Sequence, residues 1–206
     1  LGIINKGEKM STRSNIAIEL PDKNPVVNSR GGKLKVIYVH SDGYPYGVGK
    51  CLVDNYNKRE LAELLFNHGD ASYLGDTIDE CSFYGRDWKR EEDPAKEYRD
   101  EWMYMFSMRG DIHIEYIYLF KDNRWHVSTQ HFIDEKKLKN SYDGGLWYHS
   151  KFEPVLLNKE YIKYKDKHEK HAEVKMIAGL GEMLTKNFGS DNVTVQSFTD
   201  GLPKKN

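Results

Sequence analysis

One stretch of the chain sets its architecture, His40-Ser41-Asp42-Gly43-Tyr44-Pro45-Tyr46-Gly47-Val48-Gly49-Lys50. A strand-like apolar run over residues 36–39 leads into this stretch, and a helix-like run over residues 51–56 follows it. Glycine permits positive φ and close backbone approach, while proline fixes its own φ and biases the preceding residue toward extended geometry. The stretch therefore predicts a tight turn that connects a strand to a helix.

A glycine-rich turn of this kind directs free backbone N–H groups at the space above the helix N-terminus, where an anion can bind. We expect the amides from Gly47 to Gly49 and the ammonium group of Lys50 to form a loose anion pocket. The loop lacks the motif G-x-x-x-x-G-K-[ST], because residue 44 is Tyr and residue 51 is Cys, and no G-x-G-x-x-G fingerprint is present. These absences exclude a P-loop ATPase and a Rossmann site. The alternative is a structural turn with an exposed lysine.

His40 and Asp42 lie two residues apart, so on extended backbone their side chains face the same way. They are candidates for a general base with its orienting carboxylate, or for two metal ligands. The alternative is an Asx turn at Asp42-Gly43, with His40 at the end of the strand. No recognised ligand spacing supplies the further residues that a metal needs, and we expect neither a metal nor a cofactor.

Arg13 and Arg86 are each flanked by small or glycine residues, which leave the guanidinium group accessible for bidentate contact with phosphate or carboxylate. Several aromatic side chains are candidates for stacking on a base, namely Tyr38, Tyr44, Tyr46, Tyr84 and Trp88. The alternatives are a surface ion pair, such as Arg86 with Asp87, and aromatic packing in the core. The expected ligand-binding residues are Arg13, His40, Asp42, Tyr44, Gly47, Gly49, Lys50 and Arg86.

The composition restricts the partners and the location of the protein. A formal net charge of −1 provides no general attraction to nucleic acid or to an anionic membrane. The chain has only two cysteines, outside any C-x-x-C spacing, which indicates a reducing compartment. No apolar run approaches the roughly 20 residues that span a bilayer, and no secretory signal is recognisable. We expect a cytoplasmic protein without a membrane partner or a nucleic-acid partner; the sequence leaves its oligomeric state open.

The 206 residues suffice for one core with an appendage. Apolar patterning predicts a hairpin of strands over residues 15–20 and 35–40, and a strand over residues 111–120 that is apolar on both faces and therefore central. Residues 125–128 are expected to pair with it, and Pro94 is expected to start a helix that reaches Phe106. The predicted class is α+β, a single domain with a mostly antiparallel sheet packed by helices, plus a helical C-terminal extension.

Three ranges follow from this pattern. Lys6-Gly7-Glu8-Lys9 before Met10 is what a purine-rich ribosome-binding site encodes when translated in frame, so residues 1–9 are expected to be a translated leader outside the fold. Residues 10–133 are the expected core domain, and residues 134–206 the helical extension with a final strand over residues 193–198. Within the extension, an amphipathic helix over residues 171–188 is expected to bury Ala172, Met176, Leu180, Met183, Leu184 and Phe188.

Two motifs resemble those of a family of small phage and prophage proteins. These are Ser11-Thr12-Arg13-Ser14 and Tyr38-x-His40-x-Asp42-Gly43-Tyr44-Pro45, followed by Gly47 and Gly49. Later similarities are Gly69-Asp70, Leu74-Gly75, Tyr84-Gly85-Arg86-Asp87 and residues 115–120 with Trp125, so the resemblance covers about residues 10–128. The chain departs at Ser41, where the family usually has Trp. The resemblance implies a phage setting and supplies no mechanism.

Three functions fit these observations. The first is a binding module for a small anionic, nucleotide-like ligand, which sequesters a host signal. The second is a hydrolase or transferase that acts on a nucleotide and uses His40 as base with Asp42. The third is an inhibitor that binds a host protein through an exposed aromatic surface in residues 86–106 or in the C-terminal helix.

Overall fold

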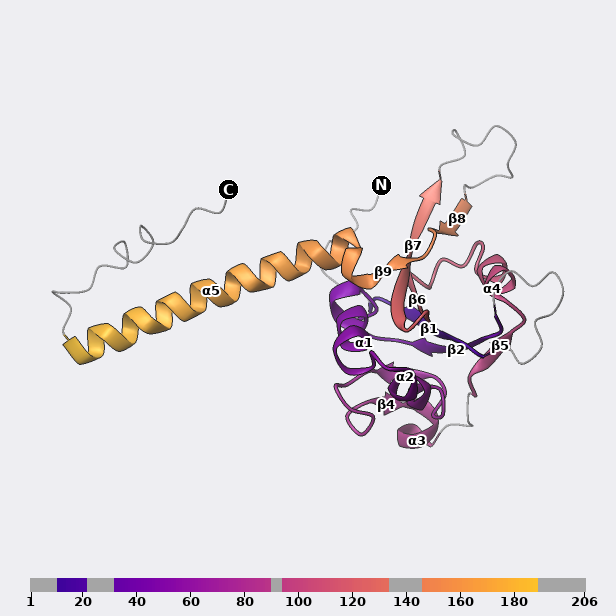
Figure 1. Cartoon of the computed structure of the whole chain (residues 1–206), viewed down its shortest axis with the longest axis horizontal. Helices are drawn as coiled ribbons and strands as arrows, with labels where there is room; N and C mark the ends of the chain where they lie inside the picture. Colours follow the sequence, from indigo (N-terminus) through magenta and orange to yellow (C-terminus); the bar gives the residue numbers. More distant parts are fainter. Residues whose placement is uncertain (1–10, 22–31, 90–93, 134–145, 189–206) are drawn as a thin grey trace, which may run out of the picture. The chain divides into compact units, whose positions relative to one another are not determined.

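The computed structural model describes residues 11–21, 32–89, 94–133 and 146–188. The expected leader over residues 1–9 and the expected strand over residues 193–198 lie outside these ranges. The chain divides into two compact units, Leu1–Tyr161 and Ile162–Asn206. The first unit contains a sheet with its covering helices, and the second contains most of one long helix (Figure 1).

A nine-stranded sheet forms the centre of the first unit. Seven strands lie in the order β4-β3-β2-β1-β6-β7-β8, while β5 pairs with β2 and β9 pairs with β7. In chain order the strands are β1 (Ser14–Glu19), β2 (Leu34–Val39), β3 (Ala71–Tyr73), β4 (Ser82–Phe83), β5 (Lys96–Tyr98), β6 (Tyr116–Lys121), β7 (Arg124–Ile133), β8 (Leu146–His149) and β9 (Glu153–Pro154). The helical elements are η1 (Pro45–Gly49), α1 (Lys50–Asn55), α2 (Arg59–Leu65), α3 (Tyr84–Trp88), α4 (Glu101–Ser107), η3 (Val155–Leu157) and α5 (Lys159–Phe188).

Most strand pairs are antiparallel, which confirms the predicted α+β class. The predicted hairpin forms between β1 and β2, with Ile16 opposite Ile37. β6 pairs with β1 in parallel and with β7 in antiparallel fashion, so it is central as its apolar faces indicate. Asp122 and Asn123 have φ of 50° and 55°, the left-handed values that a tight hairpin turn requires. The only other parallel pair among the described strands joins β2 to β3.

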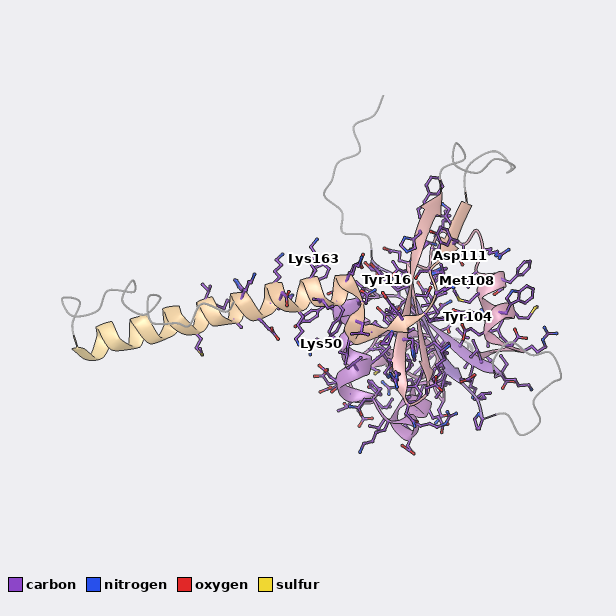
Figure 2. All side chains as sticks on the ribbon, turned by 45° about the horizontal axis from the view of Figure 1, so that its top comes forward. Lys50, Tyr104, Met108, Asp111, Tyr116 and Lys163 are labelled. Atoms are coloured by element: carbon purple, nitrogen blue, oxygen red, sulfur yellow. The ribbon has the colours of Figure 1, made fainter. Side chains whose placement is uncertain are left out.

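The sheet is covered on both faces. On one face, residues such as Ile16 and Tyr118 pack with Leu52 of α1 and Leu65 of α2. On the other face, Ala17 and its neighbours pack with Tyr104 of α4 and with Met108 at its end (Figures 1 and 2). Burial on both faces explains why consecutive residues of β1 are buried, where a sheet with one wet face would show alternation.

The first unit extends further along the chain than the sequence predicts. We expected the core to end at residue 133, but β8 and β9 both pair with β7, and Asn158 caps the start of α5 through its contacts with the amides of Glu160 and Tyr161. The structure therefore places the boundary at Tyr161. The reason is that these short strands are stabilised by pairing with a distant segment, which local patterning does not reveal.

Two helix predictions need correction. Pro94 does not start a helix; residues 96–98 form β5, and α4 begins after Asp100, whose buried carboxylate accepts the Met103 amide at 2.8 Å. The C-terminal segment is one helix, α5, and the side chains of Ala172 and Met176 are exposed where burial was expected. The side chains of the other four residues that were expected to be buried are not among those that the structure describes.

His149 in β8 is a half-buried titratable group whose ring nitrogens are shielded from solvent. Neither of its ring nitrogens has a hydrogen-bond partner of good geometry among the described residues. Burial is the main cause that lowers the pKa of His149 from 6.5 to about 4. The fold therefore holds this imidazole neutral.

Stability should consequently fall with acid. Above pH 6.5 the imidazole is neutral in both states and its contribution is complete; as the pH falls from 6.5 to about 4, only the unfolded chain takes up the proton. We expect the loss to reach about 1–2 kcal/mol, reduced from the full shift because the ring is partly solvated. Urea unfolding of His149→Gln should show a flatter pH dependence in this window than the wild type or the exposed-site control His171→Gln. Equal pH profiles for all three would contradict the assignment.

Candidate functional site

The central turn is built by close backbone packing. η1 is a π-helical turn that runs into α1, with Pro45 at its first position. Just before it, the Gly43 amide donates to the Thr12 carbonyl at 2.9 Å, and the Gly43 carbonyl accepts the Tyr118 hydroxyl at 2.8 Å. A Cβ at residue 43 would lie 2.8 Å from the Arg13 carbonyl carbon, so only glycine fits. The turn is thereby fastened to the N-terminal segment and to β6.

The amides of this turn are occupied. The Gly47 amide donates to the Tyr44 carbonyl at 2.9 Å, the Val48 amide to the Asp42 carbonyl at 2.8 Å, and the Lys50 amide to the Gly47 carbonyl. Gly49 is buried against Tyr118, and a Cβ there would lie 3.0 Å from the Tyr118 ring. The Gly47 and Val48 amides are used to build the turn and Gly49 is buried, so the anion pocket expected from the amides of Gly47 to Gly49 does not form.

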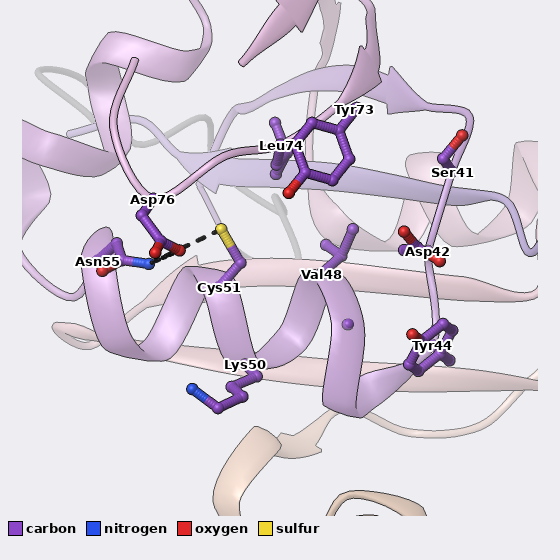
Figure 3. A pocket seen from close by; sticks show the side chains of 11 residues that line it. Ser41, Asp42, Tyr44, Val48, Lys50, Cys51, Asn55, Tyr73, Leu74 and Asp76 are labelled. Carbon is purple, nitrogen blue, oxygen red and sulfur yellow. Dashed lines mark hydrogen bonds between the residues drawn. The ribbon is translucent and has the colours of Figure 1, made fainter. Parts of the chain in front are cut away.

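A cavity of about 190 Å³ lies beside the turn, between α1 and the segment that follows β3. Its lining includes the expected residues Asp42, Tyr44, Gly47 and Lys50, together with Tyr73 and Asp76. The Lys50 ammonium forms an ion pair with Asp54, and Figure 3 shows it directed away from Tyr73 and Asp76. Two carboxylates therefore dominate the charge of this cavity, which disfavours an anion.

Cys51 also lines this cavity. Burial raises the pKa of its thiol to about 12, so the thiolate needed for nucleophilic attack is not present near neutral pH. This agrees with the lack of a nucleophile motif in the sequence.

A second group of expected residues meets at the start of β1 and the end of β2. The Arg13 guanidinium lies near the Tyr38 hydroxyl, where its charge lowers the pKa of that phenol, and its Nη1 lies 3.4 Å from Nδ1 of His113. The Tyr38 hydroxyl lies 2.9 Å from Nδ1 of His40. We call Arg13, Tyr38, His40 and His113 the arginine cluster. The cluster brings together Arg13 and His40, which were expected to bind the ligand, with Tyr38 and His113.

The contact of His113 with Arg13 indicates the tautomer of that histidine. An arginine N–H can only donate, so His113 Nδ1 accepts and the neutral ring carries its proton on Nε2. The contact between the Tyr38 hydroxyl and His40 Nδ1 fits either direction of donation, because a phenol oxygen both donates and accepts. Burial raises the pKa of Tyr38, and Arg13 partly opposes that shift, so the phenol stays protonated as this network requires.

The segments around the arginine cluster are those that carry the family resemblance. The Ser11 hydroxyl donates to the His40 carbonyl, and the Glu115 amide donates to the Arg13 carbonyl at 3.0 Å. The Tyr38 amide donates to the Asp70 carboxylate at 2.7 Å, and the Tyr84 amide donates to the Asp70 carbonyl at 3.0 Å. Short motifs that are distant in sequence therefore meet at one place.

The predicted pairing of His40 with Asp42 is not what the structure shows. Asp42 has φ of +56°, in the left-handed region, so the extended backbone assumed for the pair ends before it. His40 contacts Tyr38, whereas Asp42 lines the turn cavity. The turn at Asp42-Gly43 is the alternative that the sequence left open.

Arg86 has a structural role. Its guanidinium pairs with both carboxylate oxygens of Asp87, at 2.7 and 2.9 Å, and donates to the carbonyls of Ile78 and Cys81. This pair lowers the pKa of Asp87, whose carboxylate also accepts the Phe83 amide at 2.8 Å. The surface-pair interpretation of Arg86 with Asp87 is therefore confirmed, and most of the guanidinium N–H groups are used within the fold.

The described part of the chain contains no group of three or more His, Cys, Asp and Glu residues placed to hold a metal ion. Within that same part, no helix is long and apolar enough to cross a membrane. An exposed aromatic surface does exist on α4, where Trp102 stacks on Phe106 with ring centroids 5.3 Å apart. A protein partner for it stays a prediction.

Comparison of the chain with protein-family models, with curated proteins and with solved structures finds no match. The phage family therefore stays a resemblance.

Sequence reasoning missed the role of His113 and the use of Tyr38 as a bridge. The Asp111-His113-Glu115 region was assigned to a strand, but Asp111 instead forms a turn in which its carboxylate accepts the His113 amide at 2.7 Å. An Asp two residues before the histidine is the local signal for that turn.

The buried hydrogen bond between Tyr118 and Gly43 should be important for this region. Tyr118→Phe leaves the Gly43 carbonyl without its partner in a fully buried position, and we expect unfolding free energy to fall by about 1–3 kcal/mol. Urea denaturation with an unchanged m-value is the measurement. Tyr73→Phe removes a hydroxyl from an exposed ring and is the control that should change little. Equal effects of the two variants would contradict the anchoring role.

Proposed function

We propose that the protein is a binding module for a small anionic, nucleotide-like ligand, whose anionic group lies against the arginine cluster. The observation that carries the proposal is the state of Arg13. Its side chain is partly buried and held by two neutral groups, Tyr38 and His113, and among the described residues it forms no ion pair. Arg59, Arg86 and Arg99 each have a carboxylate partner at 3.0 Å or less.

The surroundings of Arg13 support an anion as its missing partner. A guanidinium group has five N–H donors, and the two neutral acceptors leave donors for a phosphate or carboxylate. The Nε2–H group of His113 adds a further donor. Burial raises the pKa of Glu115, and nearby Arg13 opposes this rise. The two side chains nevertheless form no ion pair among the described residues. The cluster therefore offers positive charge and hydrogen-bond donors together.

Aromatic side chains next to the arginine cluster support a nucleotide-like ligand over a bare anion. Tyr84 interacts electrostatically with Tyr38, and its ring packs edge-on against Trp88 with centroids 5.3 Å apart. The Trp88 ring is 51% exposed, and an exposed indole is a good surface for a base to stack on. In the phage setting that the resemblance implies, such a module would sequester a host signal in the bacterial cytoplasm.

The same geometry favours binding over catalysis. A general base must present an unprotonated nitrogen to its substrate. His40 has its Nδ1 engaged with the Tyr38 hydroxyl, and Asp42, the carboxylate expected to orient it, lines the turn cavity instead. The hydrolase or transferase function remains the alternative, and the chemical state of the bound ligand distinguishes the two.

The first prediction concerns affinity. We would screen nucleotides, cyclic dinucleotides, ADP-ribose and NAD by thermal shift, since ligand at about 100 times its Kd stabilises by roughly 2.7 kcal/mol. For each ligand that binds, Arg13→Ala should weaken binding by about 1.5–3 kcal/mol in isothermal titration calorimetry, as for a hydrogen bond to a charged group. Arg124→Ala removes an exposed arginine at the start of β7, opposite Lys121 at the far end of β6, and should leave Kd unchanged. An Arg13→Ala chain that keeps the wild type's number of binding sites and their Kd values would refute the site.

A further prediction concerns the ligand itself. After incubation with the wild-type chain and heat denaturation, the ligand should be recovered chemically intact, as judged by its mass. Recovery of an altered product that disappears with His40→Gln would replace binding by catalysis as the function.

A further inference from the structure

A second cavity, of about 510 Å³, opens along the edge of β2 that faces away from β1. This edge is paired with β5 at residues 34–36 and with β3 at Val39. Between these contacts the strand has no strand partner among the described residues, and the Asp70 carboxylate accepts the Tyr38 amide instead. The cavity is lined by side chains around this gap, including Lys35, Phe66, His68, Arg86 and Ala95.

The charge of this cavity is positive. Lys35, His68 and Arg86 contribute basic side chains, and its lining contains no Asp or Glu. The charge of Arg86 is largely offset by Asp87, which leaves Lys35 as the main free cation. Glu97 is the cross-strand neighbour of Lys35, but the two form no ion pair in the described part of the chain. A partly buried ammonium group beside a cavity therefore has no fixed counter-ion among the residues that the structure describes.

The remaining walls suit an organic group. Phe66 and Ala95 provide apolar surface, and His68 is held in place by packing on Phe83, with ring centroids 4.9 Å apart. Ligand cavities in proteins commonly measure about 300–1,000 Å³ and combine apolar walls with a few polar groups. This cavity falls in that range, whereas the turn cavity does not.

We propose that this cavity is a second ligand site, for a phosphorylated small molecule with an apolar or aromatic part, and that Lys35 holds the phosphate. Lysine acts as a point charge for phosphate, and His68 adds a donor beside it. The site is separate from the arginine cluster. Lys35 lies three residues from Tyr38, an odd spacing, and the two side chains therefore lie on opposite faces of β2.

The test uses ADP and inorganic pyrophosphate as probes in isothermal titration calorimetry with the full chain. In the Arg13→Ala background, ADP should still bind at one site, because Lys35 is intact. Adding Lys35→Glu should then weaken ADP at least 10-fold, whereas Lys151→Glu, an exposed lysine with the same charge change, should not. Pyrophosphate should bind more weakly than ADP, since it lacks the group that contacts Phe66.

Two results would overturn the second site: no ADP binding to the Arg13→Ala chain, or equal binding by its Lys35→Glu and Lys151→Glu derivatives. Lys35→Gln, with circular dichroism as a check of folding, separates loss of the site from loss of the fold. This test is independent of the proposed function. If the chain binds nucleotides only through Arg13, the single variant Lys35→Glu keeps the nucleotide affinity of the wild type.

Discussion

The close contact of Gly43 with the N-terminal segment is the constraint on which the rest of the site depends. Its amide and carbonyl bind Thr12 and Tyr118, so one residue joins the start of β1, the turn and β6. No side chain fits there, because a Cβ would meet the backbone of Arg13 at 2.8 Å. This contact places Arg13 next to the end of β2, and it therefore creates the arginine cluster. The position of the Arg13 side chain thus depends on the packing of one backbone segment against another.

The reversal of the chain at Asp42 determines how charge is distributed. Because Asp42 adopts a left-handed conformation, its carboxylate faces the turn cavity and is separated from His40. The side with Asp42 and Asp76 is acidic, and the side with Arg13 and His113 is basic. An anion is repelled from the first and attracted to the second. His40 and Asp42, two residues apart in the sequence, therefore belong to two sites of opposite charge.

The sequence predicted the elements whose signals are local. The β1–β2 hairpin and the central position of β6 both follow from apolar patterning. The short strands β5, β8 and β9 depend on pairing with β2 and β7, and residue patterns over two to four positions carry too little information to reveal this. For the site, the sequence predicted which residues take part better than it predicted which residues contact one another. Arg13 and His40 were identified, but their connection through Tyr38 requires tertiary structure.

The same reasoning explains why the glycine-rich turn misled the search for an anion site. A turn exposes its amides only if nearby carbonyls do not use them, and here the carbonyls of Tyr44, Asp42 and Gly47 accept the amides of Gly47, Val48 and Lys50. Positive charge must then come from side chains, and a side chain attracts a ligand only if no carboxylate already neutralises it. Lys50 and Arg86 carry the right charge but are paired with Asp54 and Asp87. Arg13 is held by neutral groups, and this difference in pairing, more than the residue type, makes it the better anchor for an anion.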